Sequence, residues 1–267
     1  RLLTRPGDAL RLALGVEYDG SQFAGWEAQP GRRTVQESVE TALSQVADGP
    51  VRVVCAGRTD AGVHAWGQVV HCEVPVRRAE RAWLLGGNAN LPPDVGFTWA
   101  RPVPGDFDAR RSAVRRHYRY LIYCHPLRPA LLRDRVCWEC RPLDEERMQA
   151  GGDLLLGEHD FSAFRASACQ ARSPVRRIER LEVSRRDRLI SIDVVANAFL
   201  HHMVRNIAGV LISIGLGKSP PDWARQVLEG RDRRLGGVTA EPQGLYLARV
   251  EYPGHFGVPA VPPLPWL

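Results

Sequence analysis

Asp60 is the single carboxylate of a short segment, Gly57–Ala65, whose residue types could support catalysis. Gly57 and Gly62 flank it, Arg58 lies two residues before it, and His64 follows four residues later. A carboxylate held at the rim of a sheet can act on a bound molecule as a nucleophile or as a general base. Asp is also common in turns, where its side chain bonds the nearby backbone. The pattern alone therefore leaves two interpretations open, a reactive loop and a structural turn.

Two apolar segments enclose this loop and must position it. Residues 51–56 and 68–74 have the composition of strands, and Gly57 and Gly62 can take backbone angles that are closed to other residues. Upstream, residues 10–18 alternate between apolar and other side chains with the period of a half-buried strand. We therefore expect a tight loop between two strands, with the carboxylate at the edge of the sheet.

The rest of the chain shows further helix and strand signals. Thr34 and Glu37 have the spacing of a capping box that opens a helix. Mixed elements with hairpin character favour an α+β fold, with mainly antiparallel sheets flanked by helices. The other expected elements are helices near 79–90, 144–156 and 199–215, and strands at 95–101, 117–124, 175–184, 189–195 and 244–252.

The chain divides best at Pro102–Asp108, which is rich in proline and carries a glycine. We expect one half over residues 8–105, which carries the Asp60 loop, and a second half over 106–252. A proline-rich tail over 253–267 is expected to be extended and mobile. The chain has 267 residues, enough for two halves that each bury a core.

Composition favours a polyanionic partner and a reducing compartment. Net charge is +6, and of 36 basic residues only Lys218 is a lysine. Arginine binds phosphate in bidentate fashion, so pairs such as Arg115-Arg116 and Arg176-Arg177 suit nucleic acid, although codon bias explains much of the ratio. The six cysteines match no secreted disulfide framework. With no membrane-length apolar run and no signal-like start, we expect a cytoplasmic protein.

The residue sequences of several segments resemble those of the tRNA pseudouridine synthase A (TruA) family, in which the aspartate of the Gly57–Ala65 segment is catalytic. The resemblance runs in order along nearly the whole chain. The further matching segments are Tyr18–Trp26 with Gln29-Pro30, Asn88 and Asn90–Pro92, Asp94-Val95, Ala109-Arg110, Ser112-Ala113, Tyr118–Tyr120, His159–Phe164, His202–Asn206 and Gly244-Leu245. It implies a pseudouridine synthase fold, in which two α/β-sandwich halves have the active-site cleft at their junction.

The resemblance implies an enzyme that isomerises uridine to pseudouridine in tRNA. The reaction breaks the bond from C1′ to N1 of uracil, rotates the base and rebonds it through C5, releasing only a proton. Asp60 begins it at C1′ or at C6, or by removing a sugar proton, and the sequence does not choose among these routes. None of them needs a metal or another cofactor. The implied partners are the anticodon stem-loop of tRNA, at nucleotides 38 to 40, and a second copy in a homodimer.

Two further catalytic residues follow from the same resemblance. Arg205 lies in a helix that is apolar nearly all round, so a buried arginine there needs a partner. The family places this arginine against the catalytic aspartate, and places Tyr118 on the flipped target base. The implied RNA-binding residues are Tyr118, Arg58, Arg110, Arg119 and Leu245.

The chain departs from the family pattern at three positions, and two other functions compete with the enzyme reading. Glu27, Asp108 and Glu241 stand where Gln, His and Pro are expected, and Asp108 puts one RNA contact in doubt. One rival is an RNA-binding module without catalysis, in which Asp60 is structural. The other is a zinc nucleobase deaminase, suggested by His71-Cys72-Glu73 and by Cys137–Cys140 of this chain. The deaminase signature has a proline before the cysteine pair, where this chain has Val136, and its histidine opens a helix, whereas His71 falls in an expected strand.

Overall fold

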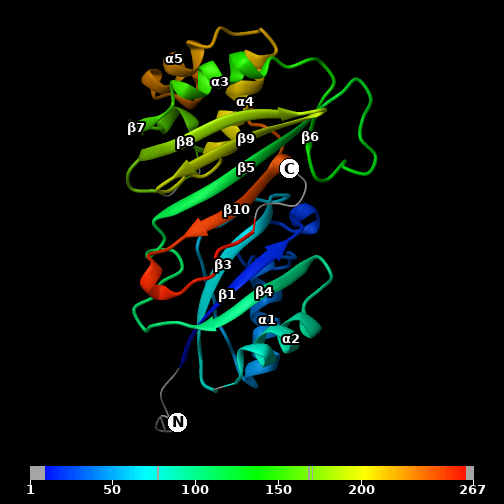
Figure 1. Ribbon diagram of the computed structural model, residues 1–267, viewed down its shortest axis with the longest axis vertical. Helices are drawn as coiled ribbons and strands as arrows, with labels where there is room; N and C mark the ends of the chain where they lie inside the picture. The colour runs from blue at the N-terminus through cyan, green and yellow to red at the C-terminus, as the bar shows by residue number, and fades with distance from the viewer. Residues whose placement is uncertain (1–9, 77, 168, 170, 263–267) are drawn as a thin grey trace. The chain divides into compact units, whose positions relative to one another are not determined.

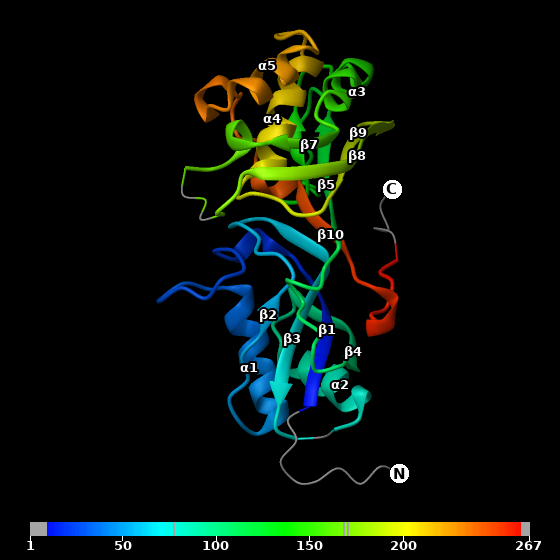
Figure 2. The same cartoon turned by 90° about the vertical axis from the view of Figure 1, so that its left-hand side faces the viewer.

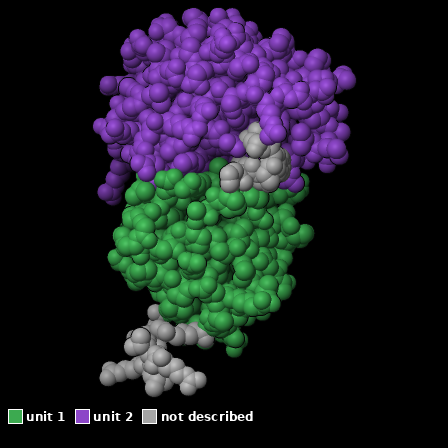
Figure 3. Space-filling model, viewed as in Figure 1, with its two compact units in different colours: residues 1–114, 247–264 green, residues 115–246, 265–267 purple. Residues whose placement is uncertain are grey.

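The computed structural model describes residues 10–76, 78–167, 169 and 171–262, and the chain forms two compact units. Unit 1 comprises Arg1–Val114 and Leu247–Leu264, and unit 2 comprises Arg115–Tyr246 and Pro265–Leu267 (Figure 3). Each unit combines antiparallel strands with helices, which confirms the predicted α+β class. The predicted halves, 8–105 and 106–252, place the boundary at a different residue.

Unit 1 is a sheet backed by two helices (Figure 1). Strand β1 lies between β3 and β4 and is antiparallel to both, and the part of β10 from residue 247 onward lies beside β3. Helix α2 packs on β4 where Gly87 makes room for the Phe97 ring, since a Cβ there would lie 2.5 Å from it. The elements are β1 (Leu10–Tyr18), α1 (Val35–Ala47), β2 (Val54–Cys55), β3 (His64–Val74), α2 (Glu80–Asn90), β4 (Val95–Pro102) and β10 (Leu245–Glu251).

Unit 2 has the strand order β5-β9-β8-β7, with β6 parallel to β5 and the other pairs antiparallel. Its three helices lie on one face of the sheet (Figures 1 and 2). Gly152 of α3 brings that helix onto Leu181, whose side chain a Cβ would meet at 2.4 Å. The elements are β5 (Arg115–Cys124), β6 (Cys137–Glu139), α3 (Glu145–Asp153), β7 (Gly157–Asp160), β8 (Val175–Arg186), β9 (Leu189–Ala196), α4 (Met203–Gly215) and α5 (Trp223–Gly230).

Two local predictions were wrong. Thr34 occupies the N-cap of α1, but its hydroxyl makes no capping hydrogen bond and is buried with no partner among the described residues. The helix expected from Phe199 begins at Met203, because His202 has a φ of +63° in the left-handed region. A residue in that conformation cannot continue a right-handed helix, so the chain turns before α4 starts.

The segment after the expected boundary belongs to unit 1. Phe107 is fully buried, with ring centroids 5.0 Å from Tyr252 and 5.2 Å from Phe256. The tail differs from the extended one we expected over its described part, residues 253–262. A 3-10 turn forms at Gly254–Phe256, and the Trp66 Nε1–H donates to the Pro262 carbonyl at 2.8 Å. The aromatic cluster of Phe107, Tyr252 and Phe256 therefore connects the two chain segments that make up unit 1.

Over the part of the chain that the structure describes, no helix has both the length and the apolar character needed to cross a bilayer.

Candidate active site

Asp60 lies half-buried in the connection between β2 and β3. The loop closes on itself, because the Val63 N–H donates to the Asp60 carbonyl at 3.1 Å. Gly62 has a φ of +79°, as the loop prediction required, whereas Gly57 stays outside that region. At the neck of the loop, the Gln68 side chain bonds both backbone groups of Gly57, its Nε2 donating at 2.6 Å and its Oε1 accepting at 3.3 Å. The carboxylate therefore sits on a closed, clamped loop.

A second glycine-containing loop, residues 19–26, supports the first. The Trp26 N–H donates to the Thr59 carbonyl at 2.9 Å. Gly25 has a φ of +104°, and a Cβ there would lie 2.8 Å from that same oxygen. Such a close approach, in a conformation that other residues rarely adopt, requires glycine. The loop at residues 19–26 and the Asp60 loop, which are far apart in the sequence, therefore pack against each other.

Buried polar side chains join these loops. The Tyr18 hydroxyl and the Thr59 hydroxyl are 2.7 Å apart, and both residues are buried. His64 is buried as well, and its Nδ1 accepts a hydrogen bond from the Gly20 N–H at 3.0 Å. Sequence reasoning did not assign a role to Tyr18, Thr59 or His64. Thr59 and His64 lie in the same motif as the aspartate and Tyr18 opens a separate matching segment, but neither position says which partners these side chains bond.

Two predicted arginines of unit 1 already have partners. Arg58 forms an ion pair with Glu27 at 2.7 Å, in which both side chains are about half exposed. The guanidinium of Arg110 contacts the Cys55 thiol at 3.7 Å, and burial raises the pKa of that thiol despite the positive charge. Glu27 is one of the departures from the family pattern. Here it places a negative charge beside an arginine of the Asp60 loop.

The chain around Arg110 is fixed by side chains bonded to its backbone. Asp108 accepts hydrogen bonds from the N–H groups of Arg110 and Arg111, at 2.9 and 2.8 Å. Burial would raise the pKa of Asp108, but these backbone bonds outweigh it and the pKa is lowered. The His71 Nδ1 accepts from the Ala109 N–H at 3.0 Å, and burial lowers the pKa of that imidazole. Asp108 therefore caps a turn, which gives this departure a structural account.

Tyr118 and Arg119 follow each other on β5 and point to opposite faces. Tyr118 is 8% exposed, and its ring meets Phe199 edge-to-face with centroids 5.0 Å apart. Arg119 lies opposite Asp193 on β9, and its Nε donates to that carboxylate at 2.7 Å. The predicted aromatic is therefore packed in place, and the predicted phosphate contact already carries an ion pair.

Arg205 lies on α4, of whose thirteen residues nine are buried, as the apolar pattern predicted. Its Nε donates to the Ala240 carbonyl at 2.8 Å, and the Ala240 N–H returns a bond to the Arg205 carbonyl at 3.1 Å. The neighbouring Asn206 accepts from the Thr239 hydroxyl at 2.7 Å. The loop segment 238–240 packs directly against α4 at Gly209. A Cβ on residue 209 would lie only 1.9 Å from the Val238 carbonyl oxygen, so this contact needs glycine.

Asp60, Arg58 and Arg110 thus belong to unit 1, whereas Tyr118, Arg119, Arg205 and Leu245 belong to unit 2. Leu245 opens β10 and is buried. Among the described residues, no metal-competent group of His, Cys, Asp or Glu side chains includes His71, Cys137 or Cys140. The residues that suggested a zinc deaminase are therefore not gathered into a metal centre.

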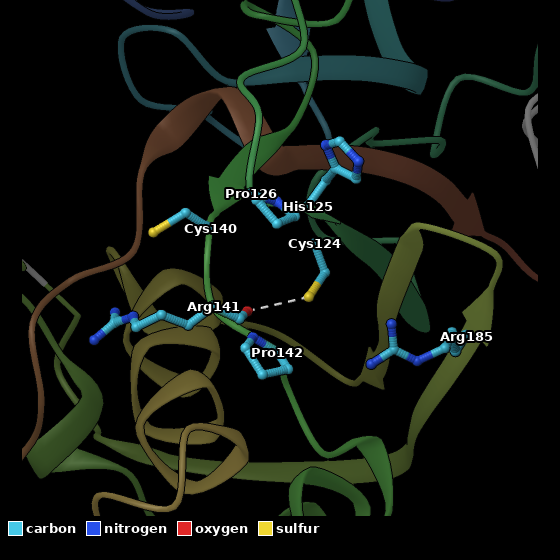
Figure 4. A pocket seen from close by; sticks show the side chains of 7 residues that line it. All are labelled: Cys124, His125, Pro126, Cys140, Arg141, Pro142 and Arg185. Carbon is cyan, nitrogen blue, oxygen red and sulfur yellow. Dashed lines mark hydrogen bonds between the residues drawn. The ribbon is translucent and has the colours of Figure 1, made fainter.

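A pocket of about 280 Å³ in unit 2 contains none of the predicted site residues. Its cations are already neutralised, because Arg141 bonds Glu139 at 2.8 Å and 2.9 Å and Arg185 lies 2.9 Å from Glu145. Figure 4 shows the Cys124 thiol turned to the Arg141 carbonyl instead of to a ligand position. The lining residues are Cys124, His125, Pro126, Cys140, Arg141, Pro142 and Arg185.

An α+β chain with this aspartate loop can be compared with known proteins. A family model described as tRNA pseudouridine synthase matches residues 15–110 and 153–253. The tRNA pseudouridine synthase A of Nitrosococcus oceani is 59% identical over 250 residues, which are 94% of this chain and 96% of that protein. That of Coxiella burnetii is 56% identical over 94% of this chain and 97% of its own length. That of Pseudomonas aeruginosa is 57% identical over 93% and 88%.

The chain belongs to the tRNA pseudouridine synthase family, a family of isomerases. The family and fold class implied by the sequence motifs are thereby confirmed, and neither the deaminase nor the non-catalytic module is favoured.

Proposed function

We propose that the protein converts uridine to pseudouridine in tRNA, with Asp60 as the reacting carboxylate. The single observation that carries this proposal is the clamped loop, which presents one half-buried aspartate in a chain of the tRNA pseudouridine synthase family. A carboxylate that attacks or deprotonates a nucleotide must be held close to one atom. Bonds from Gln68 and from the loop at 19–26 restrict its backbone in the way that such positioning requires.

The other proposed roles rest on the family resemblance and on local structure. Tyr118 supplies a ring for stacking on the flipped base, and Phe199 already holds that ring edge-on. Arg205 supplies the positive charge that keeps the carboxylate ionised, and the bonds to Ala240 orient its guanidinium. Arg58, Arg110 and Arg119 contact phosphate, and Leu245 packs against the base.

The proposed substrate is the anticodon stem-loop of tRNA, modified at nucleotides 38 to 40 on its 3′ side. The proposed working form is a cytoplasmic homodimer that uses no cofactor. The six cysteines are free thiols, which supports a reducing compartment. Net charge of +6, carried almost entirely by arginine, supports a polyanionic substrate.

The test is release of tritium from C5-labelled uridine in unmodified tRNA by the wild type and by Asp60→Asn. We expect the variant to lose on the order of 10⁴-fold or more in kcat while tRNA binding persists, because a catalytic group disappears but the phosphate contacts remain. Asp106→Asn makes the same chemical change at an exposed position of unit 1 and should release tritium at the wild-type rate.

Wild-type protein that binds tRNA without releasing tritium would contradict the proposed function for these substrates. The non-catalytic RNA-binding module would then be favoured. Tyr118→Phe provides a finer check, because it keeps the ring and removes the hydroxyl. If the ring serves only for stacking, Tyr118→Phe retains tRNA affinity, whereas Tyr118→Ala loses it.

A further inference from the structure

Three arginines of unit 2 gather where its strands begin and end. Arg116 is the second residue of β5 and Arg176 the second of β8, while Arg165 follows the short helical turn after β7. Arg116 lies opposite Ala196 of β9, which in turn lies opposite Ile178 of β8. Residues directly opposite each other share a face, as do residues two apart along a strand. The Arg116 and Arg176 side chains therefore leave the sheet on the same face.

This face is the one that the helices cover. Ala196 and Ile178 are buried on it, and Arg116 itself is only 8% exposed. Asn197 fixes the strand ends, because its carbonyl accepts from Arg116 at 3.0 Å and its side chain accepts from the Arg177 N–H at 3.0 Å. The arginines are thus held at a defined place and do not extend freely into solvent.

The described hydrogen bonds of Arg176 and Arg165 do not balance their charges. The Nη1 of Arg176 donates to the carbonyls of Ser173 and Val175, and the Nη2 of Arg165 donates to the Cys169 carbonyl at 3.0 Å. The buried Nε of Arg176 has no hydrogen-bond partner among the described residues. A carbonyl satisfies an N–H group but carries no net negative charge. Asp160, a carboxylate that senses the charge of Arg165, already accepts from the Ser162 N–H at 2.9 Å and lies 3.7 Å from Arg231.

The electrostatics of Arg176 agree with this geometry. Burial is the main cause that lowers the pKa of its guanidinium; the Cys169 thiol opposes this shift, and the positive charges of Arg116 and Arg165 lower the pKa further. Arginine nevertheless stays charged in proteins. Like charges held close together, one of them with a buried N–H that lacks a partner among the described residues, are stabilised when an anion binds.

We propose that Arg176, with Arg116 and Arg165, forms a binding site for one backbone phosphate of the RNA substrate. A phosphodiester carries one negative charge and acceptor oxygens that match the guanidinium fork. The site is additional to the contacts of Arg58, Arg110 and Arg119. The assignment of RNA as the source of the phosphate rests on the proposed function.

The test measures tRNA affinity against salt concentration for Arg176→Ala and for Arg186→Ala. Arg186 is exposed at the other end of β8, so Arg186→Ala is a control that removes the same charge from the same strand. We expect Arg176→Ala to weaken binding about tenfold and to lower the slope of log Kd against log salt by about 1, as loss of one phosphate contact does. Arg186→Ala should stay within about twofold of wild type. Tritium release at saturating tRNA should be unchanged in Arg186→Ala, and the weaker binding of Arg176→Ala should raise the KM for tRNA.

Two further variants separate binding from folding. Arg176→Lys keeps the charge but loses the fork, so its affinity should fall between wild type and Arg176→Ala. Arg165 has no part in a strand ladder, so Arg165→Ala tests the site without loosening the start of β8, and it should also lower the salt slope. If Arg176→Ala and Arg186→Ala weaken binding equally, or if Arg165→Ala leaves affinity and slope unchanged, the site is disproved.

Failure of this inference and failure of the proposed function look different. If wild-type protein releases tritium and Arg176→Ala binds like Arg186→Ala, the function stands and the site is wrong. If wild-type protein binds tRNA but releases no tritium, the proposed function is wrong. In that case the affinity and salt slope of Arg176→Ala still decide the phosphate site.

Discussion

The Asp60 loop of unit 1 and the strand-end arginines of unit 2 are held in opposite ways. Backbone hydrogen bonds, a glycine contact and a buried hydroxyl pair hold the loop, and all of these partners are uncharged. Arg165 and Arg176 are charged and donate to backbone carbonyls, which carry no net negative charge. A reacting carboxylate requires accurate placement, whereas a phosphate contact requires available charge. Changes in the loop should therefore lower kcat, and changes in the arginines should lower affinity.

Among changes to the residues that hold the Asp60 loop, the largest effect is expected from Gly25→Ala. The new Cβ would lie 2.8 Å from the Thr59 carbonyl, at a φ of +104°, so the Asp60 loop must shift. A displacement of a reacting group by about 1 Å can cost about 10²-fold in rate. We expect a loss of that order in kcat with tRNA affinity within a few-fold of wild type, measured by tritium release and by filter binding.

Gly31→Ala is the matched control for this change. Gly31 also has a positive φ, of +69°, but a Cβ there meets nothing within 4 Å. It should cost about 1 kcal/mol of unfolding free energy and leave kcat unchanged. If both alanine variants lose the same activity, the loss reflects general destabilisation and the contact with Thr59 has no special part in positioning.

A smaller effect should follow from Tyr18→Phe, which leaves the buried Thr59 hydroxyl without its 2.7 Å partner. We expect a loss of about 1–2 kcal/mol in unfolding free energy, measured by urea denaturation, and about tenfold in kcat. Adding Thr59→Val removes the orphaned hydroxyl and should restore much of the stability but not the rate, because the loop stays unpinned. A double variant with wild-type kcat would rule out a positioning role for this pair.

The smallest effect is expected from Glu27→Gln. This change removes the carboxylate that pairs with Arg58, so that the charge of Arg58 becomes available for a phosphate, as we propose for Arg176 of unit 2. An exposed ion pair such as Glu27–Arg58 contributes about 0–1 kcal/mol. Tighter tRNA binding, by about two- to fivefold at low salt and less at high salt, is therefore expected. Glu37→Gln removes an equal charge from an exposed position of α1. Equal gains in the two variants would mean that net charge matters and the pairing with Arg58 does not.

The sequence predicted most of the elements and the position of the carboxylate, because both depend on local signals. Alternation predicted β1 with its observed bounds, and the glycines around Asp60 predicted a loop between two strands. It could not show that Gly25 touches Thr59, or that Glu27 pairs with Arg58. Both contacts join segments about thirty residues apart, and residue types alone do not record which segments meet. The left-handed His202 was missed for a different reason, since histidine is enriched in that conformation but adopts it in only a small minority of cases.

The packing of Phe256 on Phe107 has a consequence for how the protein is made. Unit 1 needs residues 247–262, which supply part of β10, the Phe256 ring and the acceptor for Trp66. The described part of unit 2 ends at residue 246. As the chain leaves the ribosome, the second unit can therefore reach its native fold first, while β3 waits with an unpaired edge. We therefore expect the unit that begins the chain to complete its fold last, which proteolysis of stalled nascent chains of increasing length would test.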